Sequence, residues 1–184
     1  LCMKKITVNL SFYNQNEVLK QHVLLWKSYS QETKDQFSFC IVDDCSATPA
    51  DEVLSDIDLS DIDVKIYRVT EDLDCNIAGV RNLATTVCFK FNRRVPSDSS
   101  HEKNNQTHPA VCLLRKSDYW NVGGCEEDLV GHYGQTDPIF WYRAKGKLEV
   151  HEQRELFLDY IPDGEADINR DTAHNFRLFQ EKRL

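Results

Sequence analysis

The chain has 184 residues, 41% hydrophobic and 28% charged, which is enough for one packed domain and too little for two large ones. Its 22 basic against 30 acidic residues give a net charge of −8, so it lacks the basic surface that nucleic-acid binding requires. With no apolar run near the roughly 20 residues that cross a bilayer, no leader and an odd, scattered set of cysteines, we expect one cytoplasmic domain over residues 1–184, with no transmembrane segment and no nucleic-acid partner.

Strands and helices alternate in the first half of the chain. Residues 5–13 alternate apolar and polar side chains like a strand, and Asn14, Gln15 and Asn16 are turn and N-cap residues that precede an amphipathic helix over 17–29. The apolar run 37–42, stopped by Asp43 and Asp44, predicts a strand buried on both faces. The remaining predicted elements are a short helix at 51–54, a strand at 64–69 and a helix at 76–84.

The second half has weaker patterns. Residues 87–95 predict a strand, residues 96–108 a polar loop, and residues 110–114 another strand. Gly123 and Gly124 interrupt the chain before a predicted helix. That helix covers residues 137–145, and we expect its Trp141 and Tyr142 to pack in the core. Short strands are expected at 148–150 and 156–158, and an outer helix in the tail, 167–184.

This order predicts an α/β fold with a Rossmann-like, mostly parallel central sheet and helices on both faces. Ligands of such sheets bind at the carboxyl ends of the strands. Two predicted ends carry unusual residues, Ser11 to Asn14 and Asp43 to Ser46. An aromatic ring at the end of the first strand and a carboxylate at the end of the second could together hold a flat heterocycle. The alternative is that these residues only end the strands, with an Asx turn.

Two later segments also carry candidate chemistry. Arg81 follows Gly79 at the start of a predicted helix, where N–H groups and a guanidinium suit a diphosphate; an ordinary surface ion pair is the alternative. Glu126, Glu127 and Asp137 lie near closely spaced glycines. A carboxylate at such a bend could deprotonate a hydroxyl nucleophile.

Taken in order, these segments resemble the family 2 glycosyltransferases, which have the GT-A fold. The resemblance spans residues 5–145. Residues 6–14 resemble the family's first strand with its Tyr-Asn end, 40–46 its Val-Asp-Asp-x-Ser end, and 76–82 the Asn-Ile-Ala-Gly-Ala-Arg-Asn of one subgroup. Residues 123–127 are similar to its Gly-Gly-Phe-Asp-Glu, and Thr136-Asp137 with Arg143 to its Glu-Asp element with a following arginine.

The resemblance implies a hexosyltransferase-type enzyme. It would move a sugar from a nucleotide-sugar donor, a UDP-sugar in the first place, to a hydroxyl of a carbohydrate or glycan acceptor. The family's usual chemistry is inverting and metal-dependent, with Mn or Mg neutralising the leaving diphosphate while a carboxylate activates the acceptor.

The same resemblance assigns roles to individual residues. Asp137 matches the general base. On the donor side Ser11, Tyr13 and Asp44 would hold the base, Asp43 would support that strand end, and Asn76 would accompany Arg81, which faces the diphosphate. On the acceptor side the corresponding residues are Glu126, Glu127 and, by stacking on a sugar, Trp120.

One family feature is missing from the sequence. The family follows its Arg-Asn helix with an apolar strand ending in Asp-x-Asp, which holds the metal; the Asp-x-Asp strings at 56–58, 61–63 and 72–74 do not occupy that place. Either a segment is missing between about residues 84 and 89, or the metal site is different or absent. We expect the first, because a parallel crossover needs roughly a dozen residues. His108 and His132 are the weaker candidates for a metal or phosphate contact.

Three functions therefore remain open. The first is the glycosyltransferase, with these residues as one catalytic unit, of a longer polypeptide if more chain exists. The second is a catalytically silent sugar-nucleotide or carbohydrate-binding module of the same fold. The third, a nucleotidyltransferase, needs a basic glycine-rich loop after the first strand, and residues 14–17 offer none.

Overall fold

The computed structural model describes residues 6–83, 90–94, 106–159 and 170–183, with only the backbone described at Leu83, in β4 and β6 and over 107–110. The first part contains β1 (Ile6–Phe12), α1 (Asn16–Lys27), α2 (Gln31–Gln36), β2 (Phe37–Asp43), α3 (Ala50–Val53), β3 (Val64–Arg68) and α4 (Ile77–Leu83). The second part contains β4 (Lys90–Arg94), β5 (Thr107–Cys112), α5 (Lys116–Val122), the 3-10 helix η1 (Glu127–Leu129), α6 (Thr136–Lys147), β6 (Glu152–Asp159) and α7 (Ala173–Lys182).

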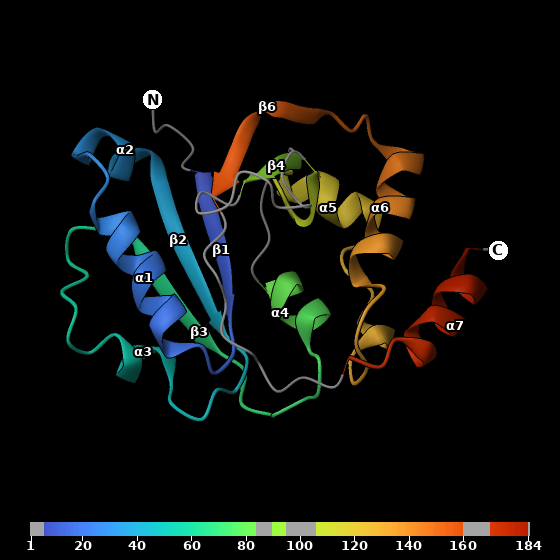
Figure 1. Cartoon of the computed structure of the whole chain (residues 1–184), viewed down its shortest axis with the longest axis horizontal. Helices are drawn as coiled ribbons and strands as arrows, with labels where there is room; N and C mark the ends of the chain where they lie inside the picture. The colour runs from blue at the N-terminus through green and yellow to red at the C-terminus, as the bar shows by residue number, and fades with distance from the viewer. Residues whose placement is uncertain (1–5, 84–89, 95–105, 160–169, 184) are drawn as a thin grey trace.

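A parallel sheet forms the first half of the molecule. Its strand order is β1-β2-β3, and both pairs are parallel (Figure 1). In this register Phe12 lies opposite Asp43, and Asp43 lies opposite Arg68. The carboxyl ends of the three strands therefore meet at one end of the sheet, and the three predicted strands are confirmed.

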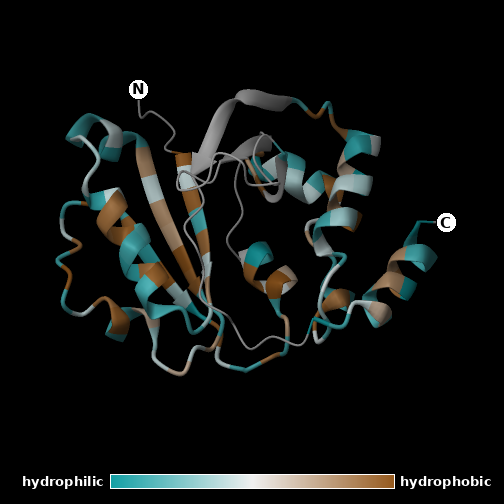
Figure 2. Ribbon diagram, in the orientation of Figure 1, coloured by the Kyte–Doolittle hydropathy of each residue, from teal (hydrophilic) through white to brown (hydrophobic). Residues whose placement is uncertain are grey.

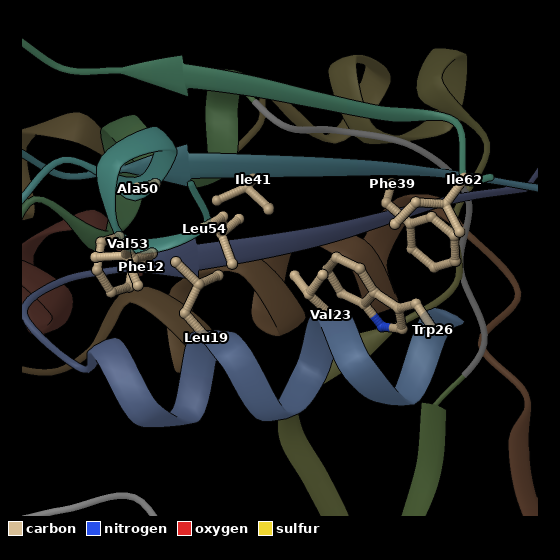
Figure 3. Packing of buried hydrophobic residues seen from close by; sticks show 10 residues of the cluster. All are labelled: Phe12, Leu19, Val23, Trp26, Phe39, Ile41, Ala50, Val53, Leu54 and Ile62. Carbon is tan, nitrogen blue, oxygen red and sulfur yellow. The ribbon is translucent and has the colours of Figure 1, made fainter. Parts of the chain in front are cut away.

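Helices cover both faces of this sheet. Because side chains alternate along a strand, Phe39 and Ile41 of β2 face α1, whereas Val42 faces the other side and packs with Val80 of α4. Trp26 of α1 stacks on Phe39 with ring centroids 4.3 Å apart (Figure 3). Figure 2 shows the largely hydrophobic strands beside the hydrophilic helix α2. The predicted α/β architecture with helices on both faces is confirmed.

The later strands form a second sheet instead of extending the first. Its order is β5-β4-β6, with β4 parallel to β6 and antiparallel to β5. Because β5 begins at Thr107, the predicted polar loop ends earlier than expected, and His108 belongs to this second sheet. A second apolar cluster joins α4, α5 and α6, with Ala78, Tyr119, Val122, Phe140 and Ala144 among its buried residues.

Some predicted elements were wrong or missed. Residues 148–150 do not form a strand: the Leu148 N–H donates to the Ala144 carbonyl at 2.8 Å, which closes α6, and Leu148 and Val150 pack on the second cluster. Helices α2 and α5 were not predicted. Helix α2 has no buried residue and so no apolar stripe, and its Ser30 cap accepts from the Thr33 N–H at 3.3 Å.

Core packing was predicted for two neighbouring aromatic residues of α6 and is correct for one. Trp141 is buried, but Tyr142 is 47% exposed, and its hydroxyl donates to the Arg183 carbonyl at 3.2 Å. Adjacent residues of a helix point about 100° apart, so one apolar stripe rarely includes both.

Residues 84–89, where a missing segment was expected, lie outside the described residues, as does most of the predicted polar loop. Within the described ranges, no helix combines the length and the apolar character that a membrane crossing needs.

Candidate functional site

The loops that follow β1 and β2 are bonded to each other. Asn14 has a left-handed backbone, with φ of 52°; its N–H donates to Ser46 Oγ at 3.0 Å, and its Oδ1 accepts from the Ala47 N–H at 2.7 Å. The Asp44 N–H donates to the Phe12 carbonyl at 2.9 Å. Asn14 thus joins the two strand ends, whereas α1 begins after Gln15 with no side-chain cap.

Asp43 is fully buried at the end of β2 and accepts hydrogen bonds from three donors. Its carboxylate accepts from the Ser46 N–H at 2.8 Å, the Ala50 N–H at 3.0 Å and Arg68 Nη1 at 2.6 Å. Arg68 also donates to the Ser46 carbonyl at 2.8 Å. Both carboxylate oxygens of Asp43 therefore hold the loop and β3, which is the geometry of a support. No sequence pattern pointed to Arg68.

The surroundings of Asp44 and Tyr13 shift the pKa of both side chains. Asp44 Oδ1 accepts from Asn76 Nδ2 at 2.8 Å. Burial raises the pKa of Asp44; the Asn76 hydrogen bond opposes this shift, and the charges of Asp72 and Asp43 add to it. Burial, Asp72 and Asp44 likewise raise the pKa of Tyr13, whose side chain is 37% exposed. Asp44 therefore lies within electrostatic range of Tyr13, and the base-binding role of the two residues stays a prediction.

An open pocket of about 200 Å³ lies between β1 and α1. It includes Ser11 and Tyr13 but not Asp44, Arg81 or Asp137. Its other lining residues are Leu10, Phe12, Gln15, Val18, Leu19 and His22. Ser11 and Tyr13 therefore border a hollow that the other candidate residues do not share.

Asn76 and Gly79 explain the start of α4. The Val80 N–H donates to the Asn76 carbonyl at 3.1 Å, so the helix begins directly after Asn76. The Asn76 side chain is buried and lies against Gly79, where a Cβ atom would overlap Asn76 Oδ1. Glycine at this spacing leaves room for the side chain that reaches Asp44.

Arg81 and Asp137 form an ion pair between α4 and the first turn of α6. Arg81 Nη1 donates to Asp137 Oδ1 at 2.5 Å, and both side chains are about three-quarters buried. Figure 1 shows α4 between the parallel sheet and α6. The residues predicted for the diphosphate and for proton transfer are therefore in direct contact. A guanidinium has five N–H donors, so this pairing leaves others to bind phosphate oxygens.

Asn82 joins α4 to the glycine bend that precedes η1. Its Oδ1 accepts from the Tyr119 hydroxyl and from the Cys125 N–H at 2.9 Å, and its Nδ2 donates to Glu127 Oε1 at 2.6 Å. Gly124, with φ of +66°, packs so closely on Asn82 and Tyr119 that a side chain there would collide. No sequence pattern pointed to a separate role for Asn82; its only signal was its place beside Arg81.

The predicted acceptor-side residues lie around this bend. Glu126 pairs with Arg143 and, at 3.2 Å, with Lys182. Burial alone would raise the pKa of Glu126, but the two cations outweigh it, and the pKa is lowered. Glu127 is exposed and bound by Asn82. Trp120 is 47% exposed, so its ring is open to a ligand. Both glutamates already have partners.

The acidic loop before α4 reaches the second glycine bend. The Gly131 N–H donates to the Asp74 carbonyl at 2.6 Å. Asp72, two residues earlier, lies within electrostatic range of Asp44. The loop therefore joins the donor-side strand ends to the segment that leads into α6.

The described residues contain no group of three His, Cys, Asp or Glu side chains set to hold a metal ion. Of the Asp-x-Asp strings, Asp56 pairs with Lys20 at 3.0 Å and Asp61 with Lys34 at 2.7 Å. His132 stacks on His174, and the side chain of His108 lies outside the described part. His132 thus contacts a ring in the described part of the chain, and the prediction for His108 falls outside it.

Two side-chain bonds connect α4 with other predicted segments. Asn76, just before the helix, bonds Asp44 at the end of β2, and Arg81, five residues further along the chain, bonds Asp137 at the start of α6. The described residues do not place Tyr13, Asp44, Arg81 and Asp137 in one pocket.

Comparison with solved structures identifies the fold. A crystal structure of residues 1–349 of TarS from S. aureus has a TM-score of 0.55 and 13% identity, over 81% of this chain and 58% of that one. The same protein in complex with UDP-GlcNAc has a TM-score of 0.57 and 10% identity, over 88% of this chain and 60% of that one. The mannosyltransferase PcManGT from Pyrobaculum calidifontis, in complex with GDP-Man and Mn²⁺, has a TM-score of 0.56 and 12% identity, over 97% of this chain and 61% of that one.

These similarities show a GT-A-like fold. The chain spans about 60% of the length of those structures. No family model and no curated protein matches the sequence.

Proposed function

We propose that residues 1–184 form a cytoplasmic glycosyltransferase domain of family 2 type. It transfers a sugar from a nucleotide-sugar, first of all a UDP-sugar, to a hydroxyl of a carbohydrate or glycan acceptor. The observation that carries the proposal is the pair of side-chain bonds at α4, Asn76 to Asp44 and Arg81 to Asp137, which connect the end of β2 with the first turn of α6. Two proteins that share the fold support it, because one was solved with UDP-GlcNAc and the other with GDP-Man.

On the donor side the strand ends hold the nucleoside. Tyr13 offers a partly exposed ring for stacking, with Ser11 beside it in the pocket. Asp44 accepts an N–H of the base while Asn76 fixes its other oxygen, and Asp43 holds the loop beneath it. Arg81 then binds the diphosphate through donors not used on Asp137.

The transfer is a single inverting displacement. The acceptor oxygen bonds to the anomeric carbon as the bond to the diphosphate oxygen breaks, and the nucleoside diphosphate leaves with that electron pair. Asp137 takes the hydroxyl proton. Arg81 places a positive charge beside the leaving group, where charge develops. Glu126, Glu127 and Trp120 border the acceptor.

A divalent ion, Mn or Mg, is part of the proposal because of the family resemblance and the Mn²⁺ in the PcManGT complex. The described residues do not fit such an ion, since they contain no suitable group of three ligands. No step above passes through the metal.

Calorimetric titration paired with a donor-hydrolysis assay tests the proposal. UDP, GDP, UDP-GlcNAc and GDP-Man are titrated with Mn and with a chelator, and release of the nucleoside diphosphate is followed. The proposal expects binding and turnover of at least one donor, and the chelator arm measures whether turnover depends on Mn. Binding without turnover supports the silent module instead. No binding rejects both.

A further inference from the structure

Helix α7 packs against residues 129–135, which contain the second glycine bend, at Gly131 and Gly134. This segment, the 129–135 loop, runs from η1 into α6. Figure 1 shows α7 beside this part of the molecule, far from the parallel sheet in view. The loop connects the candidate acceptor side, at Glu126, with the candidate base, Asp137.

Asn175 is the point of closest attachment. It is fully buried, and its Nδ2 lies within hydrogen-bond distance of three carbonyls of the loop, those of Leu129 at 3.0 Å, His132 at 2.7 Å and Gly134 at 3.0 Å, so its two N–H groups serve three acceptors and one N–H is shared. Among the described residues its Oδ1 has no hydrogen-bond partner, which costs stability in a buried site. An apolar side chain would avoid that cost and would hold none of the carbonyls.

Other side chains of α7 reinforce the attachment. The His174 ring stacks on His132, with centroids 3.9 Å apart and an interplanar angle of 20°. At the far end of the helix Lys182 bonds Asp128 at 2.7 Å and Glu126 at 3.2 Å. The helix therefore holds the 129–135 loop along its length and η1 as well.

The geometry of this loop determines how α6 begins. Gln135 has a left-handed backbone, with φ of 65°, and its carbonyl accepts from the Ile139 N–H at 3.0 Å. Asp137 lies in that first turn and points to Arg81. A loop that shifts relative to α7 therefore shifts Asp137 relative to its partner.

We propose that Asn175, with the helix that carries it, is a positioning residue for proton transfer: it fixes three loop carbonyls and thereby places Asp137 beside Arg81. The inference rests on the proposed function for the role of Asp137. Asn175 itself touches neither substrate nor the reacting atoms.

The test compares Asn175→Ala with Gln180→Ala, an exposed position of the same helix. Amide hydrogen exchange in the 129–135 loop and at Ile139 should rise about tenfold or more in Asn175→Ala, with β2 unchanged. Donor turnover should fall about tenfold or more, because small displacements of a catalytic group are costly, while UDP affinity stays within about twofold. Gln180→Ala should leave all of these at the wild-type values.

Each outcome decides the inference. Unchanged exchange at Ile139 overturns it whatever the activity, and normal turnover with a loosened loop overturns the positioning role. If Asn175→Ala does not fold, His174→Ala removes the ring that stacks on His132 of the loop, and it must raise loop exchange and lower turnover in the same direction. If the wild-type chain turns over no donor, the proposed function has failed, and exchange at Ile139 decides whether Asn175 holds the loop.

Discussion

Asp43 and Asp44 are adjacent in the sequence but differ in their surroundings. Asp43 is the last residue of β2, faces α3 and has both oxygens bonded within the fold. Asp44 lies one residue later, half-buried, with Asn76 on one oxygen. Of the two carboxylates, only Asp44 is placed to meet a ligand, so a nucleotide should distinguish them.

Replacing Asp44 with asparagine should separate binding from folding. Asp44→Asn keeps the shape but removes the charge, and we expect nucleotide affinity to fall about tenfold because charge-assisted hydrogen bonds are the stronger ones. Thermal stability should be equal or higher, since burial raises the pKa of Asp44 and the fold disfavours its ionised form. Calorimetry and thermal unfolding measure the two effects. The matched control is Asp51→Asn, on exposed α3 surface; equal affinities would remove Asp44 from the base site.

Nucleotide affinity should also depend on pH through Asp44. The pKa of Asp44 is raised above its ordinary value, first by burial, so the carboxylate protonates at higher pH than a free aspartate. Binding needs the ionised form, so affinity should weaken as the pH falls from 7 towards that pKa. The stability of the fold should change in the opposite direction over the same range, because protonation removes the unfavourable buried charge. Titrations across this range in wild type and Asp44→Asn measure it. The same slope in both proteins would contradict the assignment.

Asp137 should matter for turnover and little for binding. Asp137→Asn should lower donor turnover about 10²-fold or more, the usual scale for losing a general base, with nucleotide affinity nearly unchanged. Asp118→Asn is a suitable control, because it removes a first-turn acid from α5. Steady-state kinetics and calorimetry give the two quantities. Near-normal turnover in Asp137→Asn would exclude it as the base.

Helix α4 carries the connection between the two sides of the candidate site. Asn76 at its start reaches Asp44, Arg81 reaches Asp137, and Asn82 reaches the bend at Cys125. Its packing against the sheet, through Val80, sets the distance between these groups. The direction of this one short helix therefore determines the geometry of the site.

Two glycine substitutions test this element. Alanine normally stabilises a helix by about 0.5–1 kcal/mol relative to glycine, and Gly146→Ala in α6, with open space at its Cβ position, should show that gain. Gly79→Ala should instead lower stability and weaken nucleotide binding, because its Cβ displaces the Asn76 side chain from Asp44. Denaturant unfolding and calorimetry compare the two variants. A gain of stability in both would show that Asn76 does not depend on Gly79.

The sequence predicts those parts of the fold that are written in local patterns. The alternation in β1, the apolar run of β2 and the stop at Asp43 all correspond to observed elements. The residues that the sequence did not reveal act through distant partners: Arg68 on Asp43, and Asn175 on the 129–135 loop. A polar asparagine in a helix is expected at the surface and a phenylalanine in the core. In α7 the reverse holds, because Asn175 is buried and Phe176 beside it is 51% exposed.

In the whole molecule, the parallel sheet carries the proposed donor-side residues, and the later, more helical half carries Asp137 and the proposed acceptor-side residues. The two halves meet through α4, which contacts β1 and β2 on one side and η1 on the other. The second sheet, β5-β4-β6, is a separate layer that local patterns did not predict, because strand pairing is decided by distant segments. The proposed function thus depends on how the two halves face each other.

A crystal structure of the chain soaked with UDP-GlcNAc or GDP-Man and Mn tests the central claim most directly. We predict that the base lies against Tyr13 and Asp44, the diphosphate beside Arg81, and the sugar facing Asp137. Ligand density confined to the pocket between β1 and α1, or a nucleotide that contacts Tyr13 and Asp44 with its diphosphate directed away from Arg81, would contradict it.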